Sequence, residues 1–215
     1  MKHLIHSRAQ YLCALAAGKS VLDIGCVGRP NQAFTDPYWL HGQLRASARS
    51  LVGLDNNEAG VGQLRQHGFE IECADCTMFD IGRQFDLVVA GELIEHLSDH
   101  RGFFASVRKH LRPDGVLALT TPNALCLTYA IQNLLYGREE ELAEHTCLFS
   151  PTTLRVMLDQ NGFELVRILY YTKYEFQKLR GARLVFQWIQ RALAVFRPSF
   201  CHYLIAECRL KPNVP

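Results

Sequence analysis

The sequence predicts an α/β fold, with a mostly parallel, seven-stranded sheet and helices on both of its faces. Three observations favour this fold class. Short apolar runs that are typical of buried strands alternate with helical stretches. Two of these runs, 21–25 and 50–55, carry the aspartates Asp23 and Asp55. The 215 residues, 48% of them hydrophobic, are enough to bury one core, so we expect residues 1–215 to form a single domain.

Strands are expected where apolar runs are bounded by turn-forming residues. In chain order the predicted strands are 21–25, 50–55, 70–74, 85–90, 116–121, 164–171 and 202–209. The composition of 112–115 predicts a turn directly before the fifth strand.

Helices are expected between these strands. A leading helix carries Arg8, and its short, interrupted apolar core predicts that it is retained and not cleaved as a signal peptide. The further predicted helices are 36–48, 57–67, 98–111 and one that begins at Ser150, which supplies an N-cap ahead of Pro151. The stretches 124–149 and 173–197 are expected to be insertions that form a small helical cap.

Composition argues against several classes of protein. The net charge of +2 gives no electrostatic footprint for nucleic acid, and no apolar run approaches the roughly 18 residues of a membrane span. Eight dispersed cysteines do not form a secreted disulfide scaffold, so we expect a reducing, cytoplasmic setting. The pair Cys73 and Cys76 lacks the second pair that a structural zinc site needs.

The most informative segment is the first strand and the turn after it, Asp23-Ile24-Gly25-Cys26-Val27-Gly28. An apolar strand, a glycine turn and a second strand that ends in a carboxylate form a nucleoside-binding arrangement in α/β proteins. With an acid two residues before its first glycine, the segment resembles the class I S-adenosylmethionine-dependent methyltransferases, and in particular the O-methyltransferases of ubiquinone biosynthesis. The resemblance implies a Rossmann-like sheet whose last strand is antiparallel.

The resemblance also implies S-adenosyl-L-methionine as cofactor. The turn would wrap its methionine part, although Val27 stands where the family has a second glycine. Asp55 would hold the ribose, and Asp75 the adenine amino group. The full set of implied cofactor-binding residues is Arg8, Asp23, Gly25, Cys26, Gly28, Asp55, Asn56, Asp75, Cys76 and Gly91.

A second group of polar residues follows the fourth strand. If a helix begins at Glu92, then Glu92, Glu95 and His96 share one face. The same E-x-x-E-H string occurs in ubiquinone-biosynthesis O-methyltransferases and in small-RNA 2′-O-methyltransferases, where a downstream histidine, here His145, completes a metal site. These four residues are therefore candidate ligands for Mg²⁺ or another divalent metal. Without metal, His145 or His96 would be the catalytic base. An alternative is that the acids suit a helix N-terminus and the histidine braces a loop.

Apolar side chains recur at helical spacing in 181–196. This helix would pack on the sheet or on a second subunit of a homodimer. Alternatively, it would cover a hydrophobic acceptor or reach a lipid-linked substrate as a peripheral membrane helix.

We expect an enzyme that transfers a methyl group from S-adenosylmethionine to a hydroxyl of a small molecule or glycan. One alternative is 2′-O-methylation of the 3′-terminal ribose of RNA, which the near-neutral charge opposes. A further alternative is a non-catalytic, cofactor-binding scaffold subunit.

Overall fold

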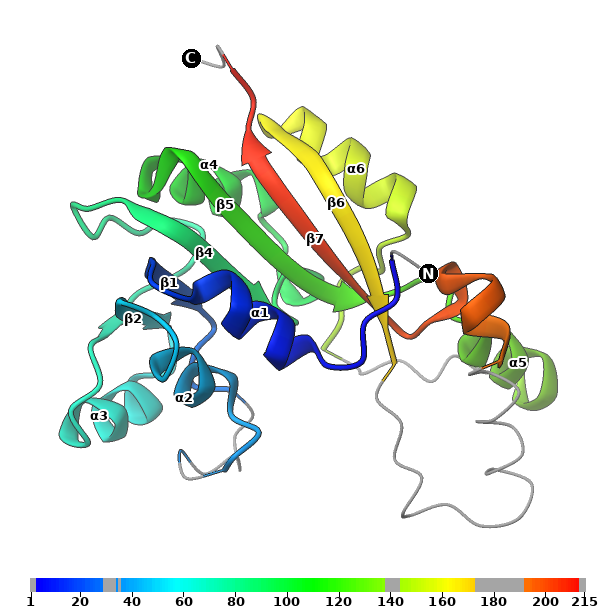
Figure 1. Ribbon diagram of the computed structural model, residues 1–215, viewed down its shortest axis with the longest axis horizontal. Helices are drawn as coiled ribbons and strands as arrows, with labels where there is room; N and C mark the ends of the chain where they lie inside the picture. Colours follow the sequence, from blue (N-terminus) through cyan, green and yellow to red (C-terminus); the bar gives the residue numbers. More distant parts are fainter. Residues whose placement is uncertain (1–2, 29–33, 35, 138–143, 173–191, 213–215) are drawn as a thin grey trace.

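The computed structural model describes residues 3–28, 34, 36–137, 144–172 and 192–212. Its centre is a seven-stranded sheet of order β3-β2-β1-β4-β5-β7-β6 (Figure 1). The strands are β1 (Ser20–Ile24), β2 (Ser50–Asp55), β3 (Ile71–Cys73), β4 (Phe85–Gly91), β5 (Leu111–Pro122), β6 (Phe163–Tyr171) and β7 (Tyr203–Leu210). Strands β1 to β5 pair in parallel, and β7 lies antiparallel between β5 and β6. The predicted fold class and the antiparallel last strand are confirmed.

Helices cover both faces of the sheet (Figure 1). They are α1 (Arg8–Ala16), α2 (Leu40–Arg45), α3 (Glu58–Gln66), α4 (His100–His110), α5 (Leu127–Tyr136) and α6 (Pro151–Gln160), with short 3₁₀ turns η1 (Ile94–His96) and η3 (Pro198–Phe200). Alternate residues of each strand face opposite layers. Leu87 and Val89 of β4 pack with α1, whereas Val88 packs with α4 and α6 in the larger core.

Local signals set the helix starts. Asn57 accepts a hydrogen bond from the Gly60 amide at the start of α3, and Asp99 does the same for Gly102 at the start of α4. Ser150 caps α6 as predicted, and Thr153 bonds back to the Ser150 amide. Such caps satisfy amides that have no partner inside the helix.

Three local predictions were wrong. Strand β5 begins at Leu111, and pairing with β4 jumps from Phe85–Leu111 to Leu87–Val116, so the turn-like residues between Leu111 and Val116 form a bulge within the strand. The predicted helix 36–48 contains helical residues only over α2. No helix begins at Glu92, which has a left-handed φ of 54°, and the chain turns helical only at η1.

The two predicted insertions are described in part. The first contains α5, and its residues 138–143 lie outside the described ranges. In the second, residues 192–196 are helical, and residues 173–191, with most of the predicted cap helix, also lie outside them. None of the helices in the described ranges combines the length and the apolar character that crossing a membrane demands.

Candidate functional site

A cavity opens at the edge of the sheet where the parallel strands β1 and β4 end. This edge is where α/β proteins place their ligands. The residues that line the cavity are Arg8, Asp23, Gly25, Cys26, Gly28, Tyr38, Trp39, Leu40, His41 and Gly91. The structure thus brings together, from three separate segments, six of the predicted cofactor-binding residues: Arg8, Asp23, Gly25, Cys26, Gly28 and Gly91.

The turn after β1 depends on its two glycines. Gly25 and Gly28 have φ values of 80° and 77°, a region that side chains with a Cβ rarely adopt. The second glycine of the turn, displaced by one position in the sequence, therefore still occupies a left-handed position. The turn keeps its backbone open to the cavity.

Asp23, on β1, is buried with 3% of its surface exposed. Its Oδ2 lies 2.9 Å from Nδ1 of His41, which is itself 1% exposed. Two residues before His41, Trp39 donates from Nε1 to the carbonyl of Cys26 at 2.8 Å and so links this segment to the turn. Burial raises the pKa of the Cys26 thiol far above its usual range, with help from the charges of Asp23 and Asp55.

His41 and Trp39 were not predicted as site residues. Their neighbourhood, Tyr38-Trp39-Leu40-His41, carries no chemical motif. The only available signal was that this segment follows the glycine turn.

The predicted nucleoside-binding residues follow the next two strands. Both oxygens of Asp55 accept backbone hydrogen bonds, from Val27 at 2.9 Å and from Asn57 at 3.0 Å, so the acid closes the loop after β1. Asn56 is exposed. These contacts hold the Asp55 carboxylate at the end of β2, adjacent to the turn that borders the cavity.

Asp75 and Cys76 follow β3. Asp75 is exposed, and hydrogen bonds from the amide and hydroxyl of Thr77 lower the pKa of its carboxyl. Burial raises the pKa of Cys76 to about 11, with a contribution from the charge of Asp75. Neither residue is among those that line the cavity.

Glu92 contacts Arg8 and is not part of the cluster that Glu95 and His96 form with His145. Its Oε1 is 3.0 Å from Arg8 Nη1 and accepts a hydrogen bond of 2.7 Å from the hydroxyl of Tyr171. Arg8 Nη1 also lies 3.4 Å from Thr120 Oγ1. The structure therefore separates Glu92 from the predicted metal cluster.

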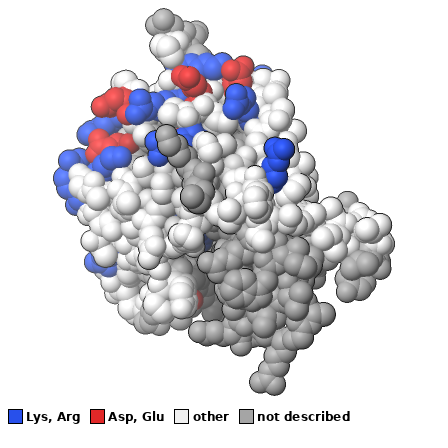
Figure 2. All heavy atoms as spheres, turned by 45° about the vertical axis from the view of Figure 1, so that its right-hand side comes forward, with Lys and Arg blue, Asp and Glu red and all other residues white. Residues whose placement is uncertain are grey.

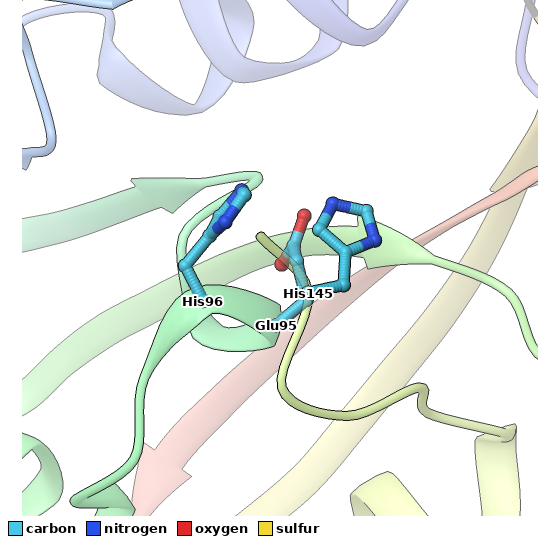
Figure 3. Close-up of side chains that lie close together, drawn as sticks. All are labelled: Glu95, His96 and His145. Atoms are coloured by element: carbon cyan, nitrogen blue, oxygen red, sulfur yellow. The ribbon is translucent and has the colours of Figure 1, made fainter. Parts of the chain in front are cut away.

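Glu95, His96 and His145 do come together, and Figure 3 shows the Glu95 carboxylate between the two imidazoles. Their potential ligand atoms lie within 4.8 Å of one another, and no other such cluster of three was found in the part of the chain that the structure describes. Glu95 is 1% exposed, and Thr121 donates to its Oε2 at 3.0 Å. Its Oε1 is buried without a hydrogen-bond partner among the described residues. Burial raises the pKa of Glu95 to about 7, and the charge of Glu92 adds to this effect.

Backbone contacts hold the two halves of this cluster together. The Thr146 amide donates to the Glu95 carbonyl at 2.8 Å, and the Thr146 hydroxyl donates to the Leu97 carbonyl at 2.8 Å. Nδ1 of His96 lies 3.2 Å from the carbonyl of Glu144, which acts as its acceptor. A proton on Nδ1 leaves Nε2 of His96 with a lone pair for a proton or a metal ion.

Comparison with known proteins is consistent with this geometry. A family model described as "Methyltransferase domain" matches residues 1–168. The chain is 30% identical over 172 residues to the mitochondrial ubiquinone biosynthesis O-methyltransferase of Bos taurus, which covers 71% of this chain and 43% of that protein. It is 28% identical over 160 residues to the ubiquinone biosynthesis O-methyltransferase of Rhizobium johnstonii, covering 69% of this chain and 61% of the relative.

The chain therefore spans about half the length of these relatives. Among solved structures, it is similar to magnesium protoporphyrin IX methyltransferase from Synechocystis PCC 6803 with bound S-adenosylhomocysteine, with a TM-score of 0.61 and 17% identity over 94% of this chain and 81% of the other. At this identity the likeness concerns the fold.

Proposed function

We propose that this chain, which belongs to the class I S-adenosylmethionine-dependent methyltransferases, methylates a hydroxyl group of a small-molecule acceptor. The observation that supports oxygen as the methylated atom is the cluster of Glu95, His96 and His145 at the ligand-binding edge of the sheet. A hydroxyl must lose its proton as it attacks, and this cluster offers groups that take it. The relatives named above, which are O-methyltransferases, support the same choice.

The cavity fits the cofactor of this family. Among the described residues of its lining, the cation Arg8 and the buried anion Asp23 match the carboxylate and ammonium of the methionine part. Gly91 borders the same cavity, and a Cβ there would lie 3.2 Å from Leu40 Cδ2, so a larger residue would crowd the lining. Asp55 would accept the ribose hydroxyls, and Asn56, Asp75 and Cys76 would border the adenine. When bound, the cofactor supplies an electrophilic sulfonium methyl group.

The residues of this chain would then orient the acceptor and move its proton. In the absence of metal, His145 or Nε2 of His96 would accept the hydroxyl proton, because a neutral imidazole offers a nitrogen lone pair to it. Glu95 would stabilise the imidazolium that forms. The remaining contribution is in-line positioning of the two reactants and exclusion of water.

The same cluster suits a divalent metal ion. The unpartnered Oε1 of Glu95 supports this, since a buried carboxylate oxygen without a hydrogen bond is costly and a cation would satisfy it. One carboxylate and two imidazoles are a donor set that favours Mn²⁺ or another transition ion over Mg²⁺. Glu92 is left out of this set because it pairs with Arg8. A histidine nitrogen that binds metal has no lone pair left for a proton, so for each imidazole the two roles exclude one another.

Surface charge supports a small acceptor over RNA. Figure 2 shows Lys and Arg side chains intermixed with Asp and Glu on the upper part of the face in view, so this charged area does not form a basic stripe. The acceptor's own chemistry, whether glycan, hydrophobic or lipid-linked, would be set by 124–149 and 173–197. The sequence also predicts a homodimer and a cytoplasmic or peripheral membrane location, and these stay predictions.

Calorimetric titration with S-adenosylhomocysteine, with and without Mn²⁺, tests the proposal. We expect a micromolar Kd for the unaltered chain and at least about tenfold weaker binding for Asp55→Ala, which loses its charged hydrogen-bond acceptor. The control is Glu72→Gln, which removes a half-exposed acid on neighbouring β3 and should leave the Kd unchanged. Absence of binding under both conditions would contradict the proposal and favour the scaffold alternative. After binding is established, methyl transfer is measured on a panel of phenols and sugars.

A further inference from the structure

The geometry points to His41 as a positioning residue that orients Asp23 toward the amino-acid end of the cofactor. The inference rests on the proposed function and deepens it. His41 would act through the carboxylate of Asp23 and not by touching the reacting atoms. It would therefore determine how tightly the methionine part is held, while leaving the nucleoside part unaffected.

The first support is the pair itself. Nδ1 of His41 lies 2.9 Å from Oδ2 of Asp23, and the two residues are 1% and 3% exposed. A buried carboxylate without a partner is costly, and it turns about its last side-chain bond. The hydrogen bond from Nδ1 removes both problems and fixes the plane of the carboxylate at the wall of the cavity.

The second support is the way in which the ring of His41 is held. It packs against Trp39 and Phe69, with ring centroids 5.3 and 5.8 Å away. Strand β2 also contributes Gly53, where a Cβ would approach His41 Cε1 to 3.0 Å and Cys26 Sγ to 2.5 Å. The ring thus lies close against Gly53, and a side chain at that position would crowd it. A side chain fixed by such packing is suited to orienting another group.

The third support is the distribution of charge around the cavity. Arg8 and Asp23 contribute one positive and one negative group to the lining. An α-amino acid carries the complementary pair, an ammonium and a carboxylate. Asp55, at the nucleoside side, is held separately by the amides of Val27 and Asn57. A change at His41 should therefore affect the two ends of the cofactor unequally.

Two ligands separate these ends in a binding experiment. S-adenosylhomocysteine has both parts, whereas 5′-methylthioadenosine has the nucleoside and the thioether without the amino acid. For His41→Leu we expect the Kd of S-adenosylhomocysteine to rise about 10- to 100-fold, the effect of losing a hydrogen bond to a charged group. The Kd of 5′-methylthioadenosine should change less than about twofold.

Further variants keep the test decisive. His41→Asn places an amide donor near the position of Nδ1 and should restore most of the affinity for S-adenosylhomocysteine, whereas His41→Gln, whose amide reaches past that position, should not. Asp23→Asn combined with His41→Leu should weaken binding no more than Asp23→Asn alone, because both remove one interaction. His67→Leu, at the exposed end of α3, is the control for loss of a histidine. Thermal unfolding of each variant verifies that it folds, and the Asn and Gln variants carry the test if His41→Leu does not.

Equal weakening of both ligands in the folded variants would overturn the inference and give His41 a general structural role, as would unchanged binding of both. If the unaltered chain binds neither ligand, the proposed function itself fails, so the two failures are distinguishable.

Discussion

Glu92 forms an ion pair with Arg8, at 3.0 Å between Oε1 and Nη1. It does not join the cluster of Glu95, His96 and His145, although Glu95 is only three residues further along the chain. Tyr171 donates to the same oxygen at 2.7 Å. The left-handed φ of 54° at Glu92, which costs on the order of 1 kcal/mol in a residue with a side chain, turns the carboxylate toward Arg8. The acid thus anchors the guanidinium at the cavity, and the proposed metal ligands are Glu95, His96 and His145 without it.

This arrangement predicts that the two glutamates differ in metal binding. Glu92→Gln should leave the Kd for Mn²⁺ within about twofold of the unaltered chain, because Glu92 is not among the clustered side chains. Glu95→Gln should weaken Mn²⁺ binding by at least about tenfold, since a neutral amide is a poor ligand for a cation. Titration calorimetry on metal-free protein measures both values. An equal loss of Mn²⁺ affinity in the two variants would mean that Glu92 also binds the metal.

Glu95 also predicts a dependence of stability on pH in metal-free protein. Its pKa is raised to about 7 in the folded chain, mainly by burial, against about 4.3 in the unfolded chain. The folded chain therefore binds more protons between these values, and stability is lost as the pH rises through them. Glu95→Gln removes the buried charge, so it should stabilise the chain by about 1–3 kcal/mol at pH 8 and have little effect at pH 4. Urea unfolding with a chelator present measures this difference, and a less stable variant at pH 8 would contradict it.

Sequence patterns predicted what neighbouring residues determine. The strands were located to within about two residues, apart from the start of β5, because buried apolar runs and their bounding residues are local signals. The glycines of the first turn, the acid Asp23 and the Ser150 cap of α6 are local signals of the same kind. These features need no knowledge of distant contacts.

The remainder depends on tertiary contacts. The turn composition of 112–115 was overridden by the pairing of Leu111 with Phe85, which draws the segment into β5 as a bulge. His41 becomes a site residue only when α2 places it against Asp23, and Glu92 leaves its expected cluster because Arg8 of α1 reaches it. A single sequence carries no periodicity or motif that encodes such pairs.

Gly53 does not line the cavity, but Gly53→Ala should distort the residues that do. The added Cβ would lie 2.5 Å from Cys26 Sγ and from Ile71 Cδ1, and both are buried. Relief of this overlap must displace the first turn or β3, which we expect to cost about 1–3 kcal/mol in stability. The Kd for S-adenosylhomocysteine should rise with it, because the turn carries the cavity's backbone. Gly62→Ala on α3 is the control, since a Cβ there meets nothing within 4 Å and an alanine favours the helix. A folded Gly53→Ala variant with unchanged stability would show that the turn moves freely.

Asp86, which lies away from the cavity, should contribute to the free energy of unfolding in a way that depends on pH. Its carboxylate accepts from the amide and the hydroxyl of Ser20, both at 2.8 Å, and also pairs with Arg49 and Arg112. These hydrogen bonds lower the pKa of Asp86 to about 2, against about 3.9 in an unfolded chain.

Because the folded pKa is the lower one, the contribution of Asp86 is fully present above about pH 4 and is lost as the pH falls toward 2. Asp86→Asn should therefore lower stability by about 1–2 kcal/mol at pH 7 and by progressively less below pH 4. Urea unfolding over this range measures the effect, with the exposed Asp114→Asn as the control. Since Ser20 lies at the opposite end of β1 from the glycine turn, the Kd for S-adenosylhomocysteine should stay unchanged. A destabilisation that is the same at pH 3 and pH 7 would mean that packing, and not the charge of Asp86, is what the asparagine removes.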